Sequence, residues 1–278
     1  MKIAHIINPV KVDFSESEES KKSYLYVAQP VTFNSMLNAK KHAKENVEIE
    51  LYTTQFREDR EIIPSGFSIT EDLEKDIHDY VDLPVRSRKL PRIKDILYKL
   101  YENSNAEYFI YTNVDIGLYE NFYNRIEEII TQGYDGFCIN RRVLPTFLGG
   151  IRLDKKNMDL IYKLKGTSHM GSDCFVFKRD MVPRFKFRNL FVGFAPIGKC
   201  IKHQTKINSK KYKHFTEEFV TFHLGDETSW TKRCDMFNSH YLKANLAEGK
   251  ASSPSVIKGK GPHGAFRKKI RIQNKWKK

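Results

Sequence analysis

Long apolar runs are missing from this 278-residue sequence. No stretch approaches the roughly 18 continuous apolar residues that a membrane-spanning helix requires. The amino end, Met1 to His5, opens directly into a strand-like segment, and it lacks the apolar core and small-residue cleavage site of a signal peptide. We therefore expect a chain with no membrane span and no secretory leader.

Cysteine is scarce, with four residues at positions 138, 174, 200 and 234. No two of them form a C-x-x-C pair, which argues against a zinc site. Cys138 and Cys174 stand inside apolar runs and are expected to be reduced core residues. This cysteine usage favours a cytoplasmic protein.

Motifs of common enzyme classes are absent or lie out of context. The sequence contains no G-x-x-x-x-G-K-[ST], and its G-x-G-x-x-G match, Gly259 to Gly264, does not follow a predicted strand as a dinucleotide-binding fingerprint does. P-loop kinases, P-loop sulfotransferases and the usual dinucleotide oxidoreductases are thereby disfavoured. No G-x-S-x-G nucleophile elbow is present either.

Positive charge is abundant but unevenly distributed. The formal net charge is +14, and residues 251–278 contribute nine cations and no acid, so residues 1–250 carry only +5. Such a tail can bind anionic lipid, nucleic acid or a polyanionic acceptor, or it can be a solvated terminus. Because the body is only mildly basic and has no RNA-recognition signature, we do not expect nucleic acid as a partner. An anionic membrane surface, bound through residues 258–278, remains open.

The apolar patterns of the first 145 residues alternate between strand and helix. This order predicts an α/β fold with a mainly parallel central sheet and helices on both faces. The second half is less regular, and no domain boundary is expected before about residue 250. Strands are predicted at 2–7, 47–53, 107–112, 135–140, 174–177 and 219–224; helices are predicted at 31–46, from Thr70, at 89–103, 122–133 and 158–164, and in part of 226–247.

The segment Asn113-Val114-Asp115 ends the buried strand at 107–112. Ligands of open parallel sheets bind beyond the carboxyl ends of the strands. Side chains at i and i+2 of extended backbone point the same way, so Asn113 and Asp115 could together bind a divalent cation or ribose hydroxyls. The alternative is a plain strand-to-helix turn in which Asp115 caps the following helix.

With its element order, this segment resembles the nucleotide-sugar glycosyltransferases of the GT-A fold, over roughly residues 1–230. In that family an Asp-x-Asp motif contacts the ribose and a Mn²⁺ or Mg²⁺ on the sugar diphosphate. Asp115 matches the second aspartate, whereas Asn113 replaces the first, which puts metal dependence in question. The resemblance implies one catalytic domain at 1–250, with a nucleotide-binding half at 1–118, an acceptor half at 119–250 and a basic tail at 251–278.

The resemblance also implies roles for residues on other loops. Asn8, in the loop after the first strand, would bind the base, although it can equally make a simple Asn-Pro turn. Asp173 would be the general base that deprotonates the acceptor, and nearby His169 would bind acceptor or phosphate. The alternative for Asp173 is hydrogen bonding to loop amides around Gly171. His223, at the end of a late strand, would complete the metal site or touch the diphosphate.

Further candidates would contact the substrates. Trp230 would lie on the rim of the site and stack on sugars, and Asp59 is a candidate for base or ribose contact. Cations are needed opposite the diphosphate, and each candidate has a solvated surface position as its alternative. These cations are Arg88, Lys89, Arg141 and Arg142.

We therefore expect a glycosyltransferase that moves a sugar from a nucleotide-diphosphate sugar to a glycan or lipid-linked acceptor, with inversion through Asp173. It would be cytoplasmic, and the tail could tether it to the inner face of a membrane. A nucleotidyltransferase of related fold is the first alternative, disfavoured because the loop Asn8-Pro9-Val10 lacks glycine. A non-enzymatic binding protein acting through the tail is the second.

Overall fold

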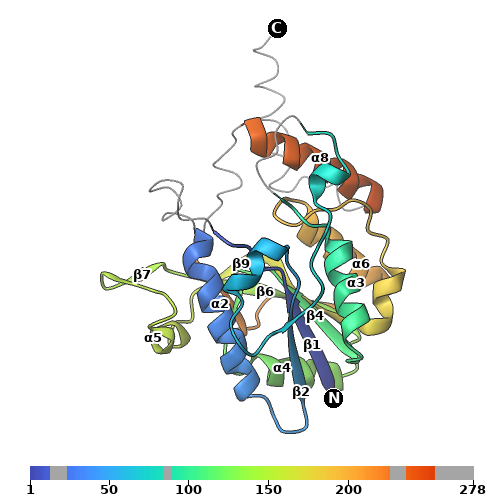
Figure 1. Cartoon of the computed structure of the whole chain (residues 1–278). Coiled ribbons are helices and arrows are strands. Elements are labelled where there is room, and N and C mark those ends of the chain that lie inside the picture. Colours follow the sequence, from blue (N-terminus) through green and yellow to red (C-terminus); the bar gives the residue numbers. More distant parts are fainter. Residues whose placement is uncertain (13–23, 84–88, 226–235, 254–278) are drawn as a thin grey trace.

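The computed structural model describes residues 1–12, 24–83, 89–225 and 236–253. Within them, nine strands form one curled sheet in the order β3-β2-β1-β4-β9-β6-β11-β5, and β10 also pairs with β6 (Figure 1). The strands of this sheet are β1 (Lys2–Ile7), β2 (Glu48–Thr53), β3 (Ser68–Ile69), β4 (Tyr108–Thr112), β5 (Gly117–Leu118), β6 (Gly136–Leu144), β9 (Thr167–Lys178), β10 (Tyr212–Phe215) and β11 (Thr221–Leu224). The fold class is therefore the predicted α/β class.

Parallel pairing dominates this sheet, as predicted. β1 pairs in parallel with β2 and β4, β2 with β3, and β6 with β10 and β11. The long strand β9 runs antiparallel between β4 and β6, and β5 runs antiparallel to β11. Because β9 is antiparallel to both β4 and β6, those two strands point the same way.

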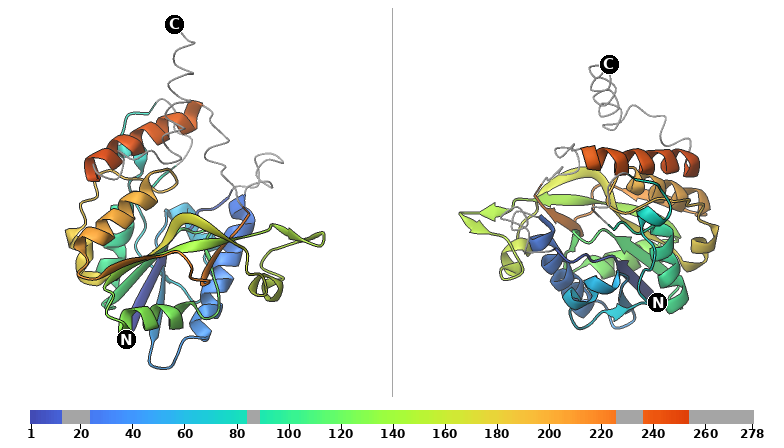
Figure 2. Two further views of the ribbon diagram at one scale, coloured as in Figure 1. Left: turned by 180° about the vertical axis from the view of Figure 1, so that it is seen from behind. Right: turned by 45° about the horizontal axis from the view of Figure 1, so that its top comes forward.

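Helices cover both faces because side chains of the central strands alternate between two cores. Ile3 and Ile110 belong to the core beneath α2 (Tyr24–Lys41) and α4 (Phe122–Thr131). Ala4 and Phe109, their chain neighbours, belong to the core beneath α3 (Ile93–Asn103) and α6 (Ile197–Asn208). The result is a three-layer arrangement with the central strands buried on both faces (Figures 1 and 2).

The helix predicted from Thr70 does not form, and this prediction was wrong. The amides of Thr70 and Leu73 instead donate to the carbonyls of Thr53 and Gln55, at 3.0 and 2.8 Å. Pairing with the chain at the end of β2 thus prevails over the local helix signal. Only the short η2 (Ile77–Asp79) follows, capped by Asp76.

The second half contains more regular structure than the sequence suggested. α6 and β10 were not predicted, and β9 spans twelve residues rather than the four apolar ones at 174–177. The helix expected within 226–247 is α8 (Met236–Ser252), and residues 226–235 lie outside the described residues. Asn245 fastens α8 to the body, because its amide donates to the carbonyls of Phe191 and Phe194.

Several shorter elements complete the fold. β7 (Phe147–Leu148) and β8 (Ile151–Arg152) form a separate two-stranded hairpin that extends away from the body, followed by α5 (Met158–Tyr162) (Figure 1). The 3₁₀ helices η1 (Arg57–Ile62) and η3 (Arg179–Arg184) lie after β2 and β9. In the part of the chain that the structure describes, no helix is long and apolar enough to cross a membrane.

Candidate active site

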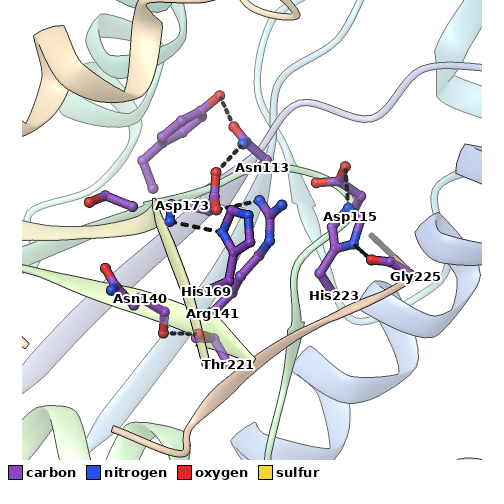
Figure 3. A network of polar contacts seen from close by, with 12 residues as sticks. Asn113, Asp115, Asn140, Arg141, His169, Asp173, Thr221, His223 and Gly225 are labelled. Atoms are coloured by element: carbon purple, nitrogen blue, oxygen red, sulfur yellow. Dashed lines mark hydrogen bonds and ion pairs between the residues drawn. The ribbon is translucent and has the colours of Figure 1, made fainter. Parts of the chain in front are cut away.

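The candidate site lies at one edge of the sheet. Since β1, β2, β4, β6 and β11 run in the same direction, their carboxyl ends meet there, and β9 begins there because it runs the opposite way. This is the edge at which open α/β sheets bind ligands. Asn113, Asp115, Arg141, His169, Asp173 and His223 come together at this edge (Figure 3).

Asn113 and Asp115 do not share one extended backbone, contrary to the sequence-based expectation. β4 ends at Thr112, and a turn follows in which the amide of Ile116 donates to the carbonyl of Asn113 at 3.1 Å. The side chain of Asn113 reaches toward β9, and that of Asp115 toward β11. Asp115 does not cap α4, which begins at Phe122 with Asn121 before it, so the capping alternative was also wrong.

Asp115 and His223, which the resemblance assigns to a metal or diphosphate site, lie next to each other. Nε2 of His223 lies 3.4 Å from Oδ2 of Asp115, and Nδ1 lies 2.6 Å from the carbonyl oxygen of Gly225. A carbonyl only accepts, so Nδ1 carries a proton. Nε2 then either carries a second proton or turns a lone pair toward the carboxylate. The second arrangement suits a cation held between the two groups.

The environment of Asp115 supports such a cation. Its Oδ1 atom is buried and has no hydrogen-bond partner among the described residues. Burial raises the pKa of this carboxyl, but the hydrogen bond and charge of His223 and the charge of Arg141 outweigh it and lower the pKa overall. A carboxylate that stays ionised with one unsatisfied oxygen fits a hard divalent ion such as Mn²⁺ or Mg²⁺. No third His, Cys, Asp or Glu joins them in the described residues, so the substrate's phosphate oxygens would have to complete the shell.

Asp173 stands in an irregularity of the β6–β9 pairing. Ile139 pairs with Cys174 and Asn140 with Ser172, so the backbone of Asp173 has no pairing partner on β6. The next regular pair is Arg142 with Ser168, which leaves Arg141 opposite residues 169–171. Extra residues of this kind bend a strand and re-aim side chains, and they recur next to active sites. Here they aim Asp173 and Arg141 toward each other.

The Asp173 carboxylate has a partner on each oxygen. Nη1 of Arg141 lies 2.5 Å from Oδ2, and Nδ2 of Asn113 donates to Oδ1 at 3.2 Å. The side chains of Asp173 and Arg141 are each only 14% exposed. The amide of Gly171 donates to Nδ1 of His169 at 2.8 Å. The alternative role of Asp173, hydrogen bonding to the loop amides around Gly171, is therefore filled at Gly171 by His169. His169 thus sits on the same bulged segment as Asp173.

A polar network lies directly behind the bulge, and the sequence did not predict it. Nε2 of His214 lies 2.5 Å from Oδ1 of Asn140 and 3.1 Å from Oγ of Ser172, and Nδ1 lies 3.2 Å from Nζ of Lys202. A protonated lysine only donates, so Nδ1 accepts and the ring proton sits on Nε2. Burial, and secondly the charge of Lys202, lower the pKa of His214 to about 4. Asn140 and Ser172 are the backbone pair that lies between the two register shifts of β6 and β9. The neutral imidazole of His214 contacts both of their side chains.

Asn8 and Asp59 lie at the other end of the same sheet edge. Nδ2 of Asn8 donates to the carbonyl of Thr54 at 2.7 Å, and Asp59 accepts from the amide of Lys11 at 2.7 Å. Burial raises the pKa of Asp59, although the hydrogen bond from Lys11 opposes the rise. Both side chains therefore fix the loop after β1, where the resemblance places the base.

The remaining cations are distributed differently. Lys89 forms an ion pair with Glu58 at 2.5 Å. Arg142 donates to the carbonyls of Lys165 and Gly166 at 2.8 and 2.6 Å, away from Asp173. Arg88, Trp230 and residues 254–278 of the basic tail lie outside the described residues. Of the predicted cations that the structure describes, Arg141 is the one joined to the cluster around Asp173.

The buried cysteines take no part in this site. Cys138, Cys174 and Cys200 are free thiols in the core, as the apolar runs around the first two predicted. Burial raises the pKa of Cys138 to about 12 and that of Cys174 well above the usual value. Thiols that remain protonated at neutral pH are poor nucleophiles, which excludes Cys174 as an attacking group.

Comparison with known proteins shows the fold. No protein-family model and no curated protein matches the sequence. Among solved structures, S. aureus TarS (residues 1–349) in complex with UDP-GlcNAc superposes with a TM-score of 0.51 at 8% identity, over 95% of this chain and 69% of that one. TarS with UDP gives 0.47 at 11% identity (91% and 73% covered). A putative glucose-1-phosphate thymidylyltransferase from Bacillus anthracis gives 0.45 at 11% identity (93% and 98% covered).

The likeness to TarS matches the predicted fold class. The chain has a GT-A-like fold, with a curled central sheet flanked by helices. At 8% identity the superposition shows the arrangement of the elements, and it assigns no role to any single residue.

Proposed function

We propose that this chain is a glycosyltransferase that moves a sugar from a nucleotide-diphosphate sugar to an acceptor hydroxyl, with inversion at the anomeric carbon. The observation that carries the proposal is the pairing of Asp115 with His223 next to the ion pair of Asp173 and Arg141, at the ligand-binding edge of a GT-A-like sheet. This edge supplies a place for a diphosphate and, beside it, a carboxylate that can serve as a base.

The proposed donor site runs along the sheet edge. The nucleoside would lie against the loop after β1, which Asn8 and Asp59 hold in place. The diphosphate would lie at Asp115 and His223, with the Arg141 guanidinium nearby to offset its charge. A bound Mn²⁺ or Mg²⁺ would neutralise the leaving diphosphate. UDP-GlcNAc bound to TarS is the precedent for a nucleotide sugar on this fold.

Asp173 is the proposed general base. Its carboxylate would accept the proton of the acceptor hydroxyl as that oxygen bonds to the anomeric carbon and the bond to the diphosphate breaks. Arg141 and Asn113 hold the carboxylate in one orientation, which favours a productive approach geometry. His169, four residues before Asp173 on β9, would contact the acceptor, and Trp230 would stack on a sugar. The proposed acceptor is a glycan or a lipid-linked sugar.

A calorimetric titration tests the donor site. The purified protein would be titrated with nucleoside diphosphates and nucleotide sugars, each with and without Mn²⁺. We expect saturable binding of one nucleotide series, and loss of that binding in Asp115→Ala. A wild-type protein that binds no member of the panel would refute the proposed function, and undiminished binding by Asp115→Ala would refute the role of Asp115.

Two further experiments separate the alternatives: titration with a nucleoside triphosphate and a sugar phosphate, and deletion of the tail. A nucleotidyltransferase would bind a nucleoside triphosphate with a sugar phosphate and release pyrophosphate. A binding protein acting through residues 251–278 would lose its function when that tail is deleted, whereas a transferase would keep nucleotide-sugar turnover.

A further inference from the structure

The β7–β8 hairpin projects from the molecule and exposes an apolar tip. Phe147 pairs with Arg152 and Leu148 with Ile151, across a turn made by Gly149 and Gly150 with φ of 56° and 83°. Glycine adopts the positive φ values of such a turn without strain. In two opposite views the hairpin stands clear of the sheet and its helices (Figures 1 and 2). A Cβ added at either glycine would meet no atom within 4 Å.

Three large apolar side chains are exposed at this tip. Phe147 is 56% exposed, Ile151 53% and Leu148 39%, although most other large apolar side chains among the described residues are buried. A contiguous exposed apolar group of this kind marks an interaction site more often than a scattered single residue does. Its small, convex shape suits insertion into a soft phase rather than contact with a flat protein surface.

The segment that carries the apolar tip is rich in exposed cations. Arg152, Lys155, Lys156, Lys163 and Lys165 are all exposed, and the only acids between residues 145 and 166 are Asp154 and Asp159. One oxygen of Asp154 accepts from the amide of Lys156 at 2.7 Å as part of a turn. The net charge of this segment is therefore +3. An apolar tip on a segment of net positive charge is complementary to an anionic lipid surface, which offers hydrocarbon below negative head groups.

The root of the hairpin is fastened to the body, so the tip is held outward. Leu153 and Ile161 are buried with Leu144 in one apolar cluster, and the amide of Leu153 donates to the carbonyl of Thr146 at 2.9 Å. Nδ2 of Asn157 donates to the carbonyl of Arg152 at 2.9 Å. A tip on a fixed root can enter a membrane without refolding of the enzyme.

The hairpin also lies next to the candidate site along the chain. It connects β6, which carries Arg141, to β9, which carries Asp173. Met170, three residues before Asp173, is 83% exposed. A further exposed apolar side chain therefore stands on the segment where the acceptor is proposed to bind.

We propose that the β7–β8 hairpin is an interfacial anchor that inserts Phe147, Leu148 and Ile151 into an anionic lipid surface. This anchor would hold the acceptor side of the sheet at the membrane, where a lipid-linked acceptor resides. That consequence rests on the proposed glycosyltransferase function, whereas lipid insertion itself does not.

Vesicle binding of the full chain tests the anchor. The protein would be sedimented with vesicles of equimolar phosphatidylglycerol and phosphatidylcholine, and with phosphatidylcholine alone. We expect Phe147→Ser with Ile151→Ser to bind the anionic vesicles about tenfold more weakly than the wild type. The matched control is Ile69→Ser with Ile207→Ser, which removes two apolar side chains exposed to 44% and 55% elsewhere. This control should bind as the wild type does.

Depth-dependent quenching separates insertion of the hairpin from attraction of the basic tail. With brominated lipids, the fluorescence that Leu148→Trp adds to that of the native Trp230 and Trp276 should be quenched more strongly than the fluorescence that Ile207→Trp adds. Equal quenching of the two variants, or equal vesicle binding by the double variant and its control, would overturn the proposal. So would a concentration-dependent dimer that forms without lipid and disappears in Phe147→Ser with Ile151→Ser, because a second copy would then be the partner.

The two proposals fail in distinguishable ways. Calorimetric binding of the nucleotide sugar should be the same in the hairpin variant and the wild type, since neither residue belongs to the donor site. Lipid insertion without donor binding would contradict the proposed function and leave the anchor standing. Donor binding without lipid insertion would contradict the anchor and leave the proposed function standing.

Discussion

Arg141 holds the carboxylate of Asp173 at 2.5 Å, and each residue stands where β6 and β9 lose regular pairing. The register shifts between β6 and β9 thus bring the two side chains together, although the two residues are not paired across the strands. Removal of one partner would leave the other charge mostly buried and uncompensated, which is costly. The arrangement keeps a carboxylate oriented in the site where the acceptor is proposed to bind.

Substitution of Asp173 tests its role as base. Asp173→Asn should lower kcat about 100-fold or more, because the amide cannot accept the acceptor proton. Donor affinity measured by calorimetry should stay the same. Asp180→Asn is the matched control, since Asp180 is 72% exposed and pairs with Arg184 at 3.1 Å on the surface. Retention of wild-type kcat in Asp173→Asn would contradict the assignment.

Substitution of His223 tests the diphosphate site. His223→Gln should weaken donor binding by about 10- to 100-fold and should reduce any enhancement by Mn²⁺, because Nε2 is the atom that faces Asp115. His42→Gln serves as the control, since His42 forms an exposed histidine–carboxylate contact with Glu120 at 3.8 Å. The role of His223 fails if both variants bind the donor equally.

His214 is expected to act as a positioning residue behind the bulge. His214→Phe should lower kcat about tenfold through misplacement of Asp173, with the donor Kd unchanged. His214→Gln keeps an amide donor toward Asn140 and should recover part of the loss. A variant that loses stability without this separation of kcat from Kd would indicate a purely structural role.

The titration of His214 offers a separate check on this network. Lys202→Met should raise the pKa of His214 above its value of about 4, because the ammonium no longer opposes protonation. The pKa should stay below the usual 6.5, because burial is the larger cause. Ring-proton chemical shifts followed by NMR against pH would measure it.

His5 should make the stability depend on pH. Its ring is buried between Tyr123 and Thr112, and burial lowers its pKa to about 3. In the unfolded chain His5 binds a proton near pH 6.5. The contribution of His5 to the free energy of unfolding is therefore fully present above about pH 6.5, and it is lost as the pH falls toward 3. The loss approaches about 1.4 kcal/mol per pH unit within that window.

Denaturant unfolding at a series of pH values measures this effect. His5→Gln should remove about one proton from the difference between the unfolded and folded states, and so flatten the dependence between pH 6 and about 4. His203 and His214 keep their own contributions, because their pKa values are also lowered by burial. An unchanged slope would show that His5 is protonated in the folded protein.

Sequence patterns were sufficient for the nucleotide half of the sheet. β1 has the predicted bounds, and β2, β4, α3 and α4 lie where apolar periodicity placed them, because these elements bury one or both faces. The segment at 70–76 failed because its amides bond to the end of β2, which no local pattern reveals. The polar half of β9 gave no strand signal, since its side chains are exposed or half-buried at the sheet edge.

The sequence by itself determined the α/β class, the reduced buried cysteines and the list of polar residues that follow strands. Only the tertiary structure decided which of them meet. It separated Asn113 from Asp115, joined Asp115 to His223 and Asp173 to Arg141, and added His214 behind them. The physical reason is that periodicity records burial along one element. Contacts between residues 30 to more than 100 positions apart depend instead on strand order, register and bulges.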